Sequence, residues 1–274
     1  MSEAMVKEYY ASCVKEEWRR LAIDAYHKLE YETSLHFLIK HLPKKGLVLD
    51  AGGGPGRYTV ELAKRGYKVV LLDLVSENIQ FAKGQITRNK LQGNVVSMQQ
   101  GSIIDLACYG HNTFDAVLCL GGALSHVVDK NDRKKAISEL TRVAKGNAPI
   151  IASVIGKLGA IVAILWNSQN EIEMPHFQLF RKTGDYHGGH GFTACHLYLA
   201  EELAKDFKGQ KLTQIEMVGL QGIGSHQNDR INELAKDRKL WRHWLSTHLE
   251  TCTNPAVVGI SEHIMIICKK KKNA

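Results

Sequence analysis

A glycine-rich stretch near the start of the chain constrains its fold more than any other feature. The apolar residues Leu47–Leu49 predict a strand, and the acid Asp50 follows it directly. Four glycines then lie within residues 51–56, and residues 57–65 have the apolar and polar pattern of a helix. Glycine lets the backbone adopt positive φ and approach a ligand, and the helix N-terminus directs unpaired N–H groups into the loop. This strand, loop and helix predict a nucleotide-binding turn.

The spacing of the glycines excludes two common nucleotide-binding motifs. A dinucleotide fingerprint that begins at Gly52 would need glycine or alanine at its last position, where this chain has Arg57. One that begins at Gly53 would need glycine at its second position, where this chain has Pro55. The Gly-Lys-Ser/Thr of a P-loop is also absent. The loop therefore belongs to a different class of nucleotide site.

The remaining pattern is Asp-x-Gly-x-Gly-x-Gly, which begins at Asp50 and includes Gly52 and Gly54. The next predicted strand, residues 68–72, ends at a second acid, Asp73. An acid at this distance after the first glycine can accept hydrogen bonds from both hydroxyls of a ribose. The pattern therefore predicts a site for a nucleoside.

These residues resemble a known family. The stretch VLDAGGGPGRYTVELAKRGYKVVLLDLV (residues 48–75) resembles the opening of a class I S-adenosylmethionine-dependent methyltransferase, and GSIIDL and FDAVLCLGGALSHV continue the resemblance. The later GISEHIMIICKK is similar to the last strand of that family. The resemblance implies an α/β fold with a doubly wound, mostly parallel, seven-stranded sheet whose last strand is antiparallel. It also implies S-adenosyl-L-methionine as the cofactor.

The resemblance further suggests which side chains contact the cofactor. Ser102 stands where the family usually has an acid that bonds the adenine amino group, and Ile103 would lie against the ring. A hydroxyl can bond the same amine, and Asp105 is an alternative. The full set of expected cofactor-binding residues is Asp50, Gly52, Gly54, Asp73, Leu74, Ser102, Ile103, Leu120 and Arg20.

Arg20 lies in a segment, residues 1–43, that is expected to form a helical cap over the pocket. Apolar residues recur at helical spacing between Trp18 and Leu29, which predicts one continuous helix face. Arg20 is the best candidate within the cap because a guanidinium can clamp a carboxylate. Further candidates for the pocket are Tyr9, Tyr10 and Glu17.

The rest of the chain is expected to complete a single methyltransferase domain, residues 1–274. Residues 44–155 form the cofactor-binding core, residues 156–199 an inserted lid, and residues 200–274 the C-terminal part of the sheet, where residues 228–247 predict one long helix. The aromatic residues of the lid favour an apolar or aromatic methyl acceptor. They are Trp166, Phe177, Phe180 and Tyr186.

Methyl transfer from a sulfonium needs alignment of donor and acceptor and the exclusion of water, and a base where the acceptor carries a proton. Histidine suits that role because it titrates near neutral pH. His126 follows the predicted strand at residues 114–120, at the edge where open sheets bind ligands, and His187 in the lid is the second candidate. No metal site is expected, because His187, His190 and His196 have no carboxylate or cysteine partner at ligand spacing.

The predicted function is methyl transfer to O, N or S of a small-molecule acceptor. The formal net charge of +8 leaves an RNA or tRNA methyltransferase open as an alternative, and a non-catalytic cofactor-binding sensor subunit is another. Methylation of a base amino group usually accompanies an Asn/Asp-Pro-Pro-aromatic segment, where this chain has the sequence of residues 120–123, Leu-Gly-Gly-Ala. Nucleic acid is therefore not the expected partner.

The length of the apolar runs and the spacing of the cysteines predict the cellular location of the protein. The longest apolar run, Leu158–Trp166, is shorter than the ~20 residues that cross a bilayer, and the polar N-terminus does not resemble a signal peptide. The six cysteines are scattered without paired spacing. A cytoplasmic protein without membrane contact is expected, and its oligomeric state is left open.

Overall fold

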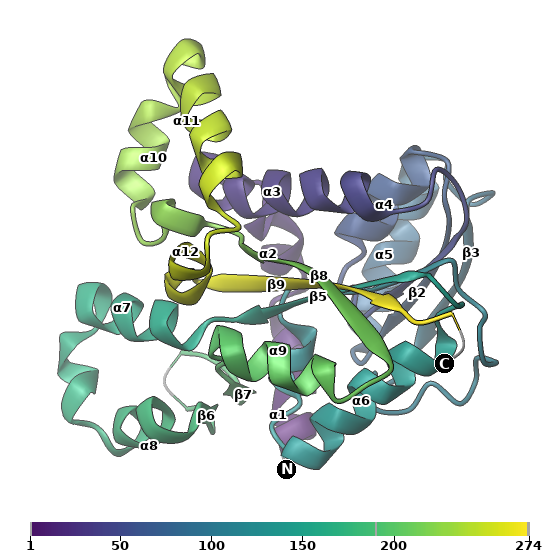
Figure 1. The fold of residues 1–274 in the computed structure, drawn as a ribbon, viewed down its shortest axis with the longest axis horizontal. Coiled ribbons are helices and arrows are strands. Elements are labelled where there is room, and N and C mark those ends of the chain that lie inside the picture. Colours follow the sequence, from purple (N-terminus) through teal and green to yellow (C-terminus); the bar gives the residue numbers. More distant parts are fainter. Residues whose placement is uncertain (1, 190, 273–274) are drawn as a thin grey trace.

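A seven-stranded sheet forms the centre of the computed structural model, which describes residues 2–189 and 191–272 (Figure 1). The strand order is β3-β2-β1-β4-β5-β9-β8. Neighbouring strands from β3 to β5 are parallel, whereas β9 is antiparallel to both β5 and β8. This confirms the predicted fold class. The strands are β1 (Leu47–Ala51), β2 (Lys68–Asp73), β3 (Val95–Gln100), β4 (Ala116–Cys119), β5 (Pro149–Ile155), β8 (Leu212–Gly219) and β9 (His263–Lys270).

Helices cover both faces of the sheet, because its central strands are apolar on both sides. One face packs against α3 (Ala25–His41), α4 (Arg57–Lys64) and α5 (Ser76–Arg88). The other packs against α6 (Lys130–Val143) and α9 (Ala200–Lys208). Figure 1 shows these two layers above and below the sheet. The remaining helices and turns in this part of the fold are α1 (Ser2–Ser12), α2 (Val14–Arg20), η1 (Ala123–His126), η3 (Gly222–Gly224) and α12 (Pro255–Ile260).

The strand order reverses direction between β1 and β4. From β1 the chain proceeds outward to β2 and β3, and it then returns to β4 on the other side of β1. At such a point the loops that follow neighbouring strands separate and leave a crevice at the carboxyl ends. The glycine loop after β1 and the η1 turn after β4 lie at this crevice.

The N-terminal cap differs from the prediction of one continuous helix face between residues 18 and 29, which is wrong. Helix α2 ends at Arg20, and α3 begins at Ala25. The cause is Asp24, whose side chain accepts a hydrogen bond of 2.9 Å from the backbone N–H of His27 and so caps a new helix. The apolar residues of the stripe therefore lie on two helices.

Residues 156–199 contain helices of their own, α7 (Lys157–Asn167), η2 (Gln169–Glu173) and α8 (Pro175–Thr183), followed by the short strands β6 (Asp185–Tyr186) and β7 (Cys195–His196). Phe177, Phe180 and Tyr186 are buried in an apolar cluster within this segment, and Trp166 is 67% exposed. None of the four lines a cavity beside the glycine loop. The prediction that these aromatic residues contact the acceptor is therefore wrong, because Phe177, Phe180 and Tyr186 form the core of the segment itself and Trp166 faces solvent.

The predicted helix at residues 228–247 is two helices, α10 (Asn228–Leu234) and α11 (Arg238–Thr251). Asp237 separates them, since its side chain accepts hydrogen bonds from the backbone N–H groups of Lys239 (2.7 Å) and Leu240 (3.1 Å). The pair projects from the body of the molecule at the top of Figure 1. Within residues 2–189 and 191–272, no helix combines the length and apolar character needed to cross a membrane.

Candidate active site

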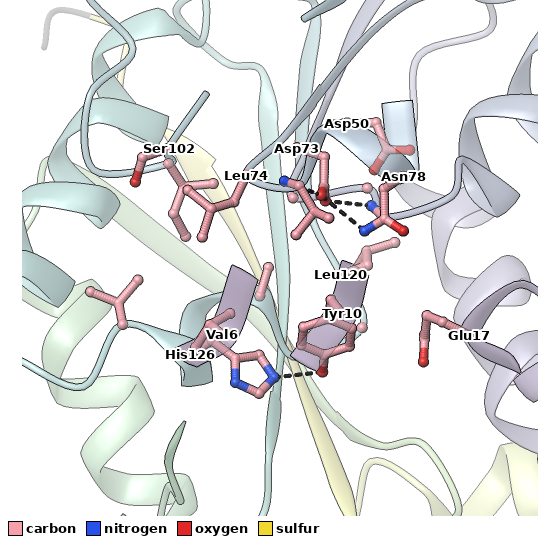
Figure 2. Close-up of a pocket in the computed structure, with 18 of the residues that line it drawn as sticks. Val6, Tyr10, Glu17, Asp50, Asp73, Leu74, Asn78, Ser102, Leu120 and His126 are labelled. Atoms are coloured by element: carbon pink, nitrogen blue, oxygen red, sulfur yellow. Dashed lines mark hydrogen bonds between the residues drawn. The ribbon is translucent and has the colours of Figure 1, made fainter. Parts of the chain in front are cut away.

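A pocket opens at the carboxyl ends of β1, β2 and β4, beside the glycine loop (Figure 2). Helices α1 and α2 of the N-terminal cap form its opposite wall. All nine residues that the sequence assigned to a cofactor line this pocket. They are Asp50, Gly52, Gly54, Asp73, Leu74, Ser102, Ile103, Leu120 and Arg20.

Two glycines of the loop have distinct reasons to be glycine. Gly52 has a φ of +74°, and a Cβ there would lie 2.5 Å from the Cβ of Ala123, so the loop packs directly against η1. Gly54 has a φ of +57° and faces open space, because no atom lies within 4 Å of where its Cβ would be. The loop backbone at Gly54 is therefore open to a ligand in the pocket.

Asp73 lies at the end of β2 and is nearly buried, at 6% exposure. Its carboxylate accepts hydrogen bonds from the backbone N–H of Gly54 (2.7 Å), the backbone N–H of Val75 (2.9 Å) and the side-chain amide of Asn78 (3.0 Å). Burial raises the pKa of this carboxyl, and the three donors oppose the rise. An ionised carboxylate can accept about four hydrogen bonds, so one acceptor position remains.

Asn78 supplies the next acceptor. Its amide nitrogen faces Asp73, which leaves its buried Oδ1 with no hydrogen-bond partner among the residues that the structure describes. Asn78 also lines the pocket, and Figure 2 shows it beside Asp73. A buried oxygen without a donor costs free energy unless a ligand or water supplies one. Together the two side chains can accept a pair of hydroxyl donors.

Asp50 is fully buried under the glycine loop. Its Oδ2 accepts a hydrogen bond of 2.6 Å from the hydroxyl of Thr59 on α4, and its Oδ1 has no partner within the described part of the chain. Burial raises the pKa of Asp50 to about 6. The Thr59 contact joins α4 to β1 and so fixes the end of the loop.

Ser102 and Ile103 line the pocket after β3, as expected, and Ile103 also belongs to the core. Asp105, the alternative to Ser102, does not line it. The Asp105 carboxylate accepts a hydrogen bond of 3.0 Å from the backbone N–H of Ala107 and so stabilises the following turn.

Arg20 reaches the pocket from α2, but two carboxylates hold its guanidinium. Its Nε donates to Glu17 at 3.0 Å, and its Nη1 donates to the buried Glu30 at 2.7 Å. Glu17 lines the pocket as well. One guanidinium and two carboxylates give this group a net charge of −1, so Arg20 adds no net positive charge to the pocket.

Arg57 ties the glycine loop to the cap. Its guanidinium lies 4.3 Å from the centroid of the Trp18 ring and donates a hydrogen bond to the Trp18 carbonyl. A guanidinium over an indole face is an attractive contact. Helix α2 is thus held against the first residue of α4.

His126 and Tyr10 form a hydrogen-bonded pair at the pocket wall (Figure 2). His126 Nδ1 lies 3.0 Å from the carbonyl oxygen of Ala194, which can only accept, so Nδ1 carries the proton. Nε2 therefore accepts a hydrogen bond of 2.8 Å from the Tyr10 hydroxyl. Burial lowers the pKa of His126 to about 4 and raises that of Tyr10 well above its ordinary value. Both side chains are neutral at pH 7.

The other histidines named from the sequence lie elsewhere. His187 is exposed and lies outside the lining of the pocket, and His190 lies outside the described residues. His196 is buried between two carboxylates, Asp185 at 2.6 Å and Glu202 at 2.9 Å. His126 is thus the candidate that the fold brings to the pocket.

The pocket is acidic although the chain is basic. Six carboxylates and two guanidinium groups are present among its described lining residues, in a chain with a formal net charge of +8. Such a concave acidic surface attracts cationic ligands. The carboxylates belong to Glu3, Glu17, Asp50, Asp73, Asp129 and Asp132, and the guanidinium groups to Arg20 and Arg57.

The chain is similar in sequence to known methyltransferases. A family model described as a methyltransferase domain matches residues 48–147. The glycine/sarcosine N-methyltransferase of Parasynechococcus marenigrum is 31% identical over 147 residues, which cover 53% of this chain and 50% of that protein. Four of the relatives are named for glycine and sarcosine methylation, and the match to this chain covers between 22% and 50% of the length of each.

Solved structures agree in fold. A SAM-dependent methyltransferase from Methanosarcina mazei aligns with a TM-score of 0.60 at 19% identity, over 86% of this chain and 97% of that one. The 1,6-didemethyltoxoflavin-N1-methyltransferase of Burkholderia thailandensis, crystallised with S-adenosylhomocysteine, aligns with a TM-score of 0.59 at 15% identity, over 98% and 88%. At these identities the likeness concerns the fold alone.

Proposed function

We propose that the protein transfers a methyl group from S-adenosylmethionine to a small molecule, because residues 48–147 match a methyltransferase-domain family model and the fold aligns with that of a SAM-dependent methyltransferase. The methylated atom is N, O or S, and the names of the glycine/sarcosine relatives favour nitrogen. The observation that carries the proposal is the pocket, in which Asp73, the orphaned oxygen of Asn78 and the open backbone of Gly54 converge.

The residues of the pocket fit the cofactor. The remaining acceptor position of Asp73 and the free Oδ1 of Asn78 suit two ribose hydroxyls, while Ser102 and Ile103 suit the amine and the ring of the adenine. S-adenosylmethionine supplies a methyl group on a positively charged sulfur, and the excess of carboxylates in the pocket stabilises that charge. Arg20 reaches the same space, with Leu74 and Leu120 providing apolar contact.

Tyr10 and His126 are proposed to orient the acceptor. The Tyr10 hydroxyl donates to His126, so its lone pairs remain to accept a hydrogen bond from an acceptor N–H or O–H. His126 is a weak base with both ring nitrogens bonded, and it therefore positions Tyr10 and does not itself remove a proton. The exposed His187 lines neither this pocket nor the cavity beside it, so we assign it no role in the reaction.

The acidic pocket also bears on the two alternatives. A phosphate-rich acceptor such as RNA would approach the carboxylates against their charge, which favours a small acceptor over a nucleic acid. A non-catalytic sensor would bind the cofactor equally well, so only turnover separates it from an enzyme.

The test has two steps. Calorimetry with S-adenosylmethionine and S-adenosylhomocysteine should give saturable binding to the full chain. Incubation with methyl-labelled S-adenosylmethionine and metabolite pools should then yield a labelled small molecule together with S-adenosylhomocysteine. Absence of cofactor binding rules out the proposal, and binding without any labelled product supports the sensor.

A further inference from the structure

A second cavity adjoins the cofactor pocket below the N-terminal cap. The two cavities share Tyr10, Glu17, Arg20 and Gly121. Gly121 directly follows the Leu120 that lines the cofactor pocket at the end of β4. A ligand in the second cavity would therefore lie next to a cofactor in the first, which is where a methyl acceptor must be.

Aromatic rings border the second cavity. Tyr9 and Phe192 both line it, and their ring centroids lie 5.5 Å apart. The ring centroid of Tyr10 lies 5.2 Å from that of Tyr9. His126 completes the cluster, and its ring centroid lies 5.1 Å from that of Tyr10 and 5.7 Å from that of Phe192. The cluster joins α1, η1 and the loop before β7, so three distant segments of the chain fix its geometry. Aromatic faces attract cations.

The charges of the cavity also favour a cationic ligand. Glu16 and Glu17 line it, and the guanidinium there, Arg20, is held by Glu17 and by the buried Glu30. Two lining carboxylates and the buried Glu30 thus accompany the guanidinium, and the basic side chain of His263, which also lines the cavity, lies 3.6 Å from Glu30. A ligand carboxylate would meet this excess of negative charge, whereas an ammonium group would be stabilised by it.

We propose that the methyl acceptor is an amine without a carboxylate group, bound as a cation in the second cavity between Tyr9, Phe192 and the carboxylates of Glu16 and Glu17. This rests on the proposed methyltransferase function and narrows its acceptor to one chemical class. It separates this chain from an enzyme whose acceptor is an amino acid, because the two basic side chains among the described lining residues, Arg20 and His263, both lie against the buried Glu30.

The bound amine is first deprotonated and then methylated. The bound ammonium gives one proton to water and becomes a neutral amine. The new N–C bond forms from the nitrogen lone pair while the methyl–sulfur bond breaks, and the electron pair of that bond stays on the sulfur. The product is a methylated ammonium together with S-adenosylhomocysteine, and the Glu17 carboxylate stays ionised beside Arg20.

The experiment compares matched probes by calorimetry on the full chain saturated with S-adenosylhomocysteine. One set is 2-phenylethylamine, phenylalanine and 2-phenylethanol, and a smaller pair is ethanolamine and serine. Each amine should bind about tenfold more tightly than its amino acid, because the amino acid brings a carboxylate to the acidic cavity. The amine should also bind more tightly than the alcohol of the same shape.

Variants locate the site. Glu16→Gln and Tyr9→Leu, at two residues that line the second cavity but not the cofactor pocket, should each weaken binding of the amine about 3- to 10-fold, with S-adenosylhomocysteine affinity changed by less than about twofold. Glu8→Gln is the matched control, since Glu8 is an exposed carboxylate on α1 outside both cavities, and it should leave amine binding unchanged. Mass spectrometry after addition of S-adenosylmethionine should find the N-methylated amine.

The outcomes distinguish this inference from the proposed function. If S-adenosylhomocysteine produces no binding heat, the methyltransferase function itself fails. If it binds but the amino acids or the alcohol bind as tightly as the amines, the amine proposal is overturned while the function stands. The same holds if neither amine binds at millimolar concentration, or if Glu16→Gln and Tyr9→Leu leave amine binding unchanged.

Discussion

Asn78 is the residue whose role the structure makes most explicit. Its amide donates to Asp73 while its buried Oδ1 has no donor within the described residues. We expect Asn78→Ala to weaken S-adenosylmethionine binding by about 5- to 10-fold, the value of one hydrogen bond to a ligand. Asn78→Asp should weaken it further, because a second carboxylate would face Asp73. Calorimetry measures both, with the exposed Gln80→Ala on the same helix as the control. Equal affinity in Asn78→Ala would remove this residue from the site.

The pair Tyr10 and His126 predicts a particular pH dependence. Burial lowers the pKa of His126 to about 4, so its neutral form, which accepts from Tyr10, persists down to about pH 5. The value of kcat/KM should therefore show no acidic limb near the ordinary histidine value of 6.5 from this residue. Tyr10→Phe should lower kcat/KM about 10- to 100-fold, since the acceptor loses its orientation. An acidic limb near pH 6.5 that disappears in His126→Gln would instead assign the histidine as the base.

At the scale of elements, local patterns predicted most of the sheet but not where helices break. The strands from Leu47 to Asp73 could be predicted because each is a short apolar run beside a glycine or an acid. The breaks at Asp24 and Asp237 could not, because an aspartate on a helical stripe is either a surface residue or a cap, and only the surrounding backbone decides. The lid aromatic residues failed as a guide for a similar reason, since Phe177 and Phe180 pack against their own segment.

Helices α3 and α11 meet at a buried histidine that should make stability depend on pH. His248 is fully buried beside the Thr33 hydroxyl (2.8 Å), and its Nδ1 has no partner in the described structure. Burial lowers its pKa from 6.5 to about 4. Below pH 6.5 His248 is protonated in the unfolded chain, whereas in the folded chain it stays neutral down to about pH 4. The folded state therefore loses stability as the pH falls through this window.

The expected loss from His248 is about 2 kcal/mol at pH 5 relative to pH 8. Urea unfolding at several pH values measures it. His248→Gln should remove this part of the pH dependence, whereas His243→Gln, an exposed position on the same helix, should retain it. A His248→Gln protein with the full pH dependence would contradict the assignment.

At the scale of the whole molecule, the candidate site depends on contacts that no local pattern contains. The glycine loop and Asp73 could be predicted from spacing alone, because they follow one another along the chain. The pairing of Arg20 with Glu30 could not, since it crosses the break between α2 and α3. Nor could the ring cluster of Tyr9, Tyr10 and Phe192, which joins segments more than 180 residues apart. The sequence therefore indicates the cofactor, and the proposal for the acceptor depends on tertiary contacts.

The uneven distribution of charge gives the last prediction. An acidic pocket in a chain of net charge +8 should prefer the cationic S-adenosylmethionine to its neutral-sulfur product. Raising salt shortens the Debye length from about 10 Å at 0.1 M to about 3 Å at 1 M and so screens this preference. The Kd of S-adenosylmethionine should therefore rise about threefold more than that of S-adenosylhomocysteine over this range. Asp132→Asn in the pocket should reduce the difference, and Glu250→Gln on the exposed surface of α11 should not. If both ligands respond equally to salt in the unaltered protein, the carboxylates of the pocket do not act on the sulfonium charge, and the basis of the acceptor preference weakens with them.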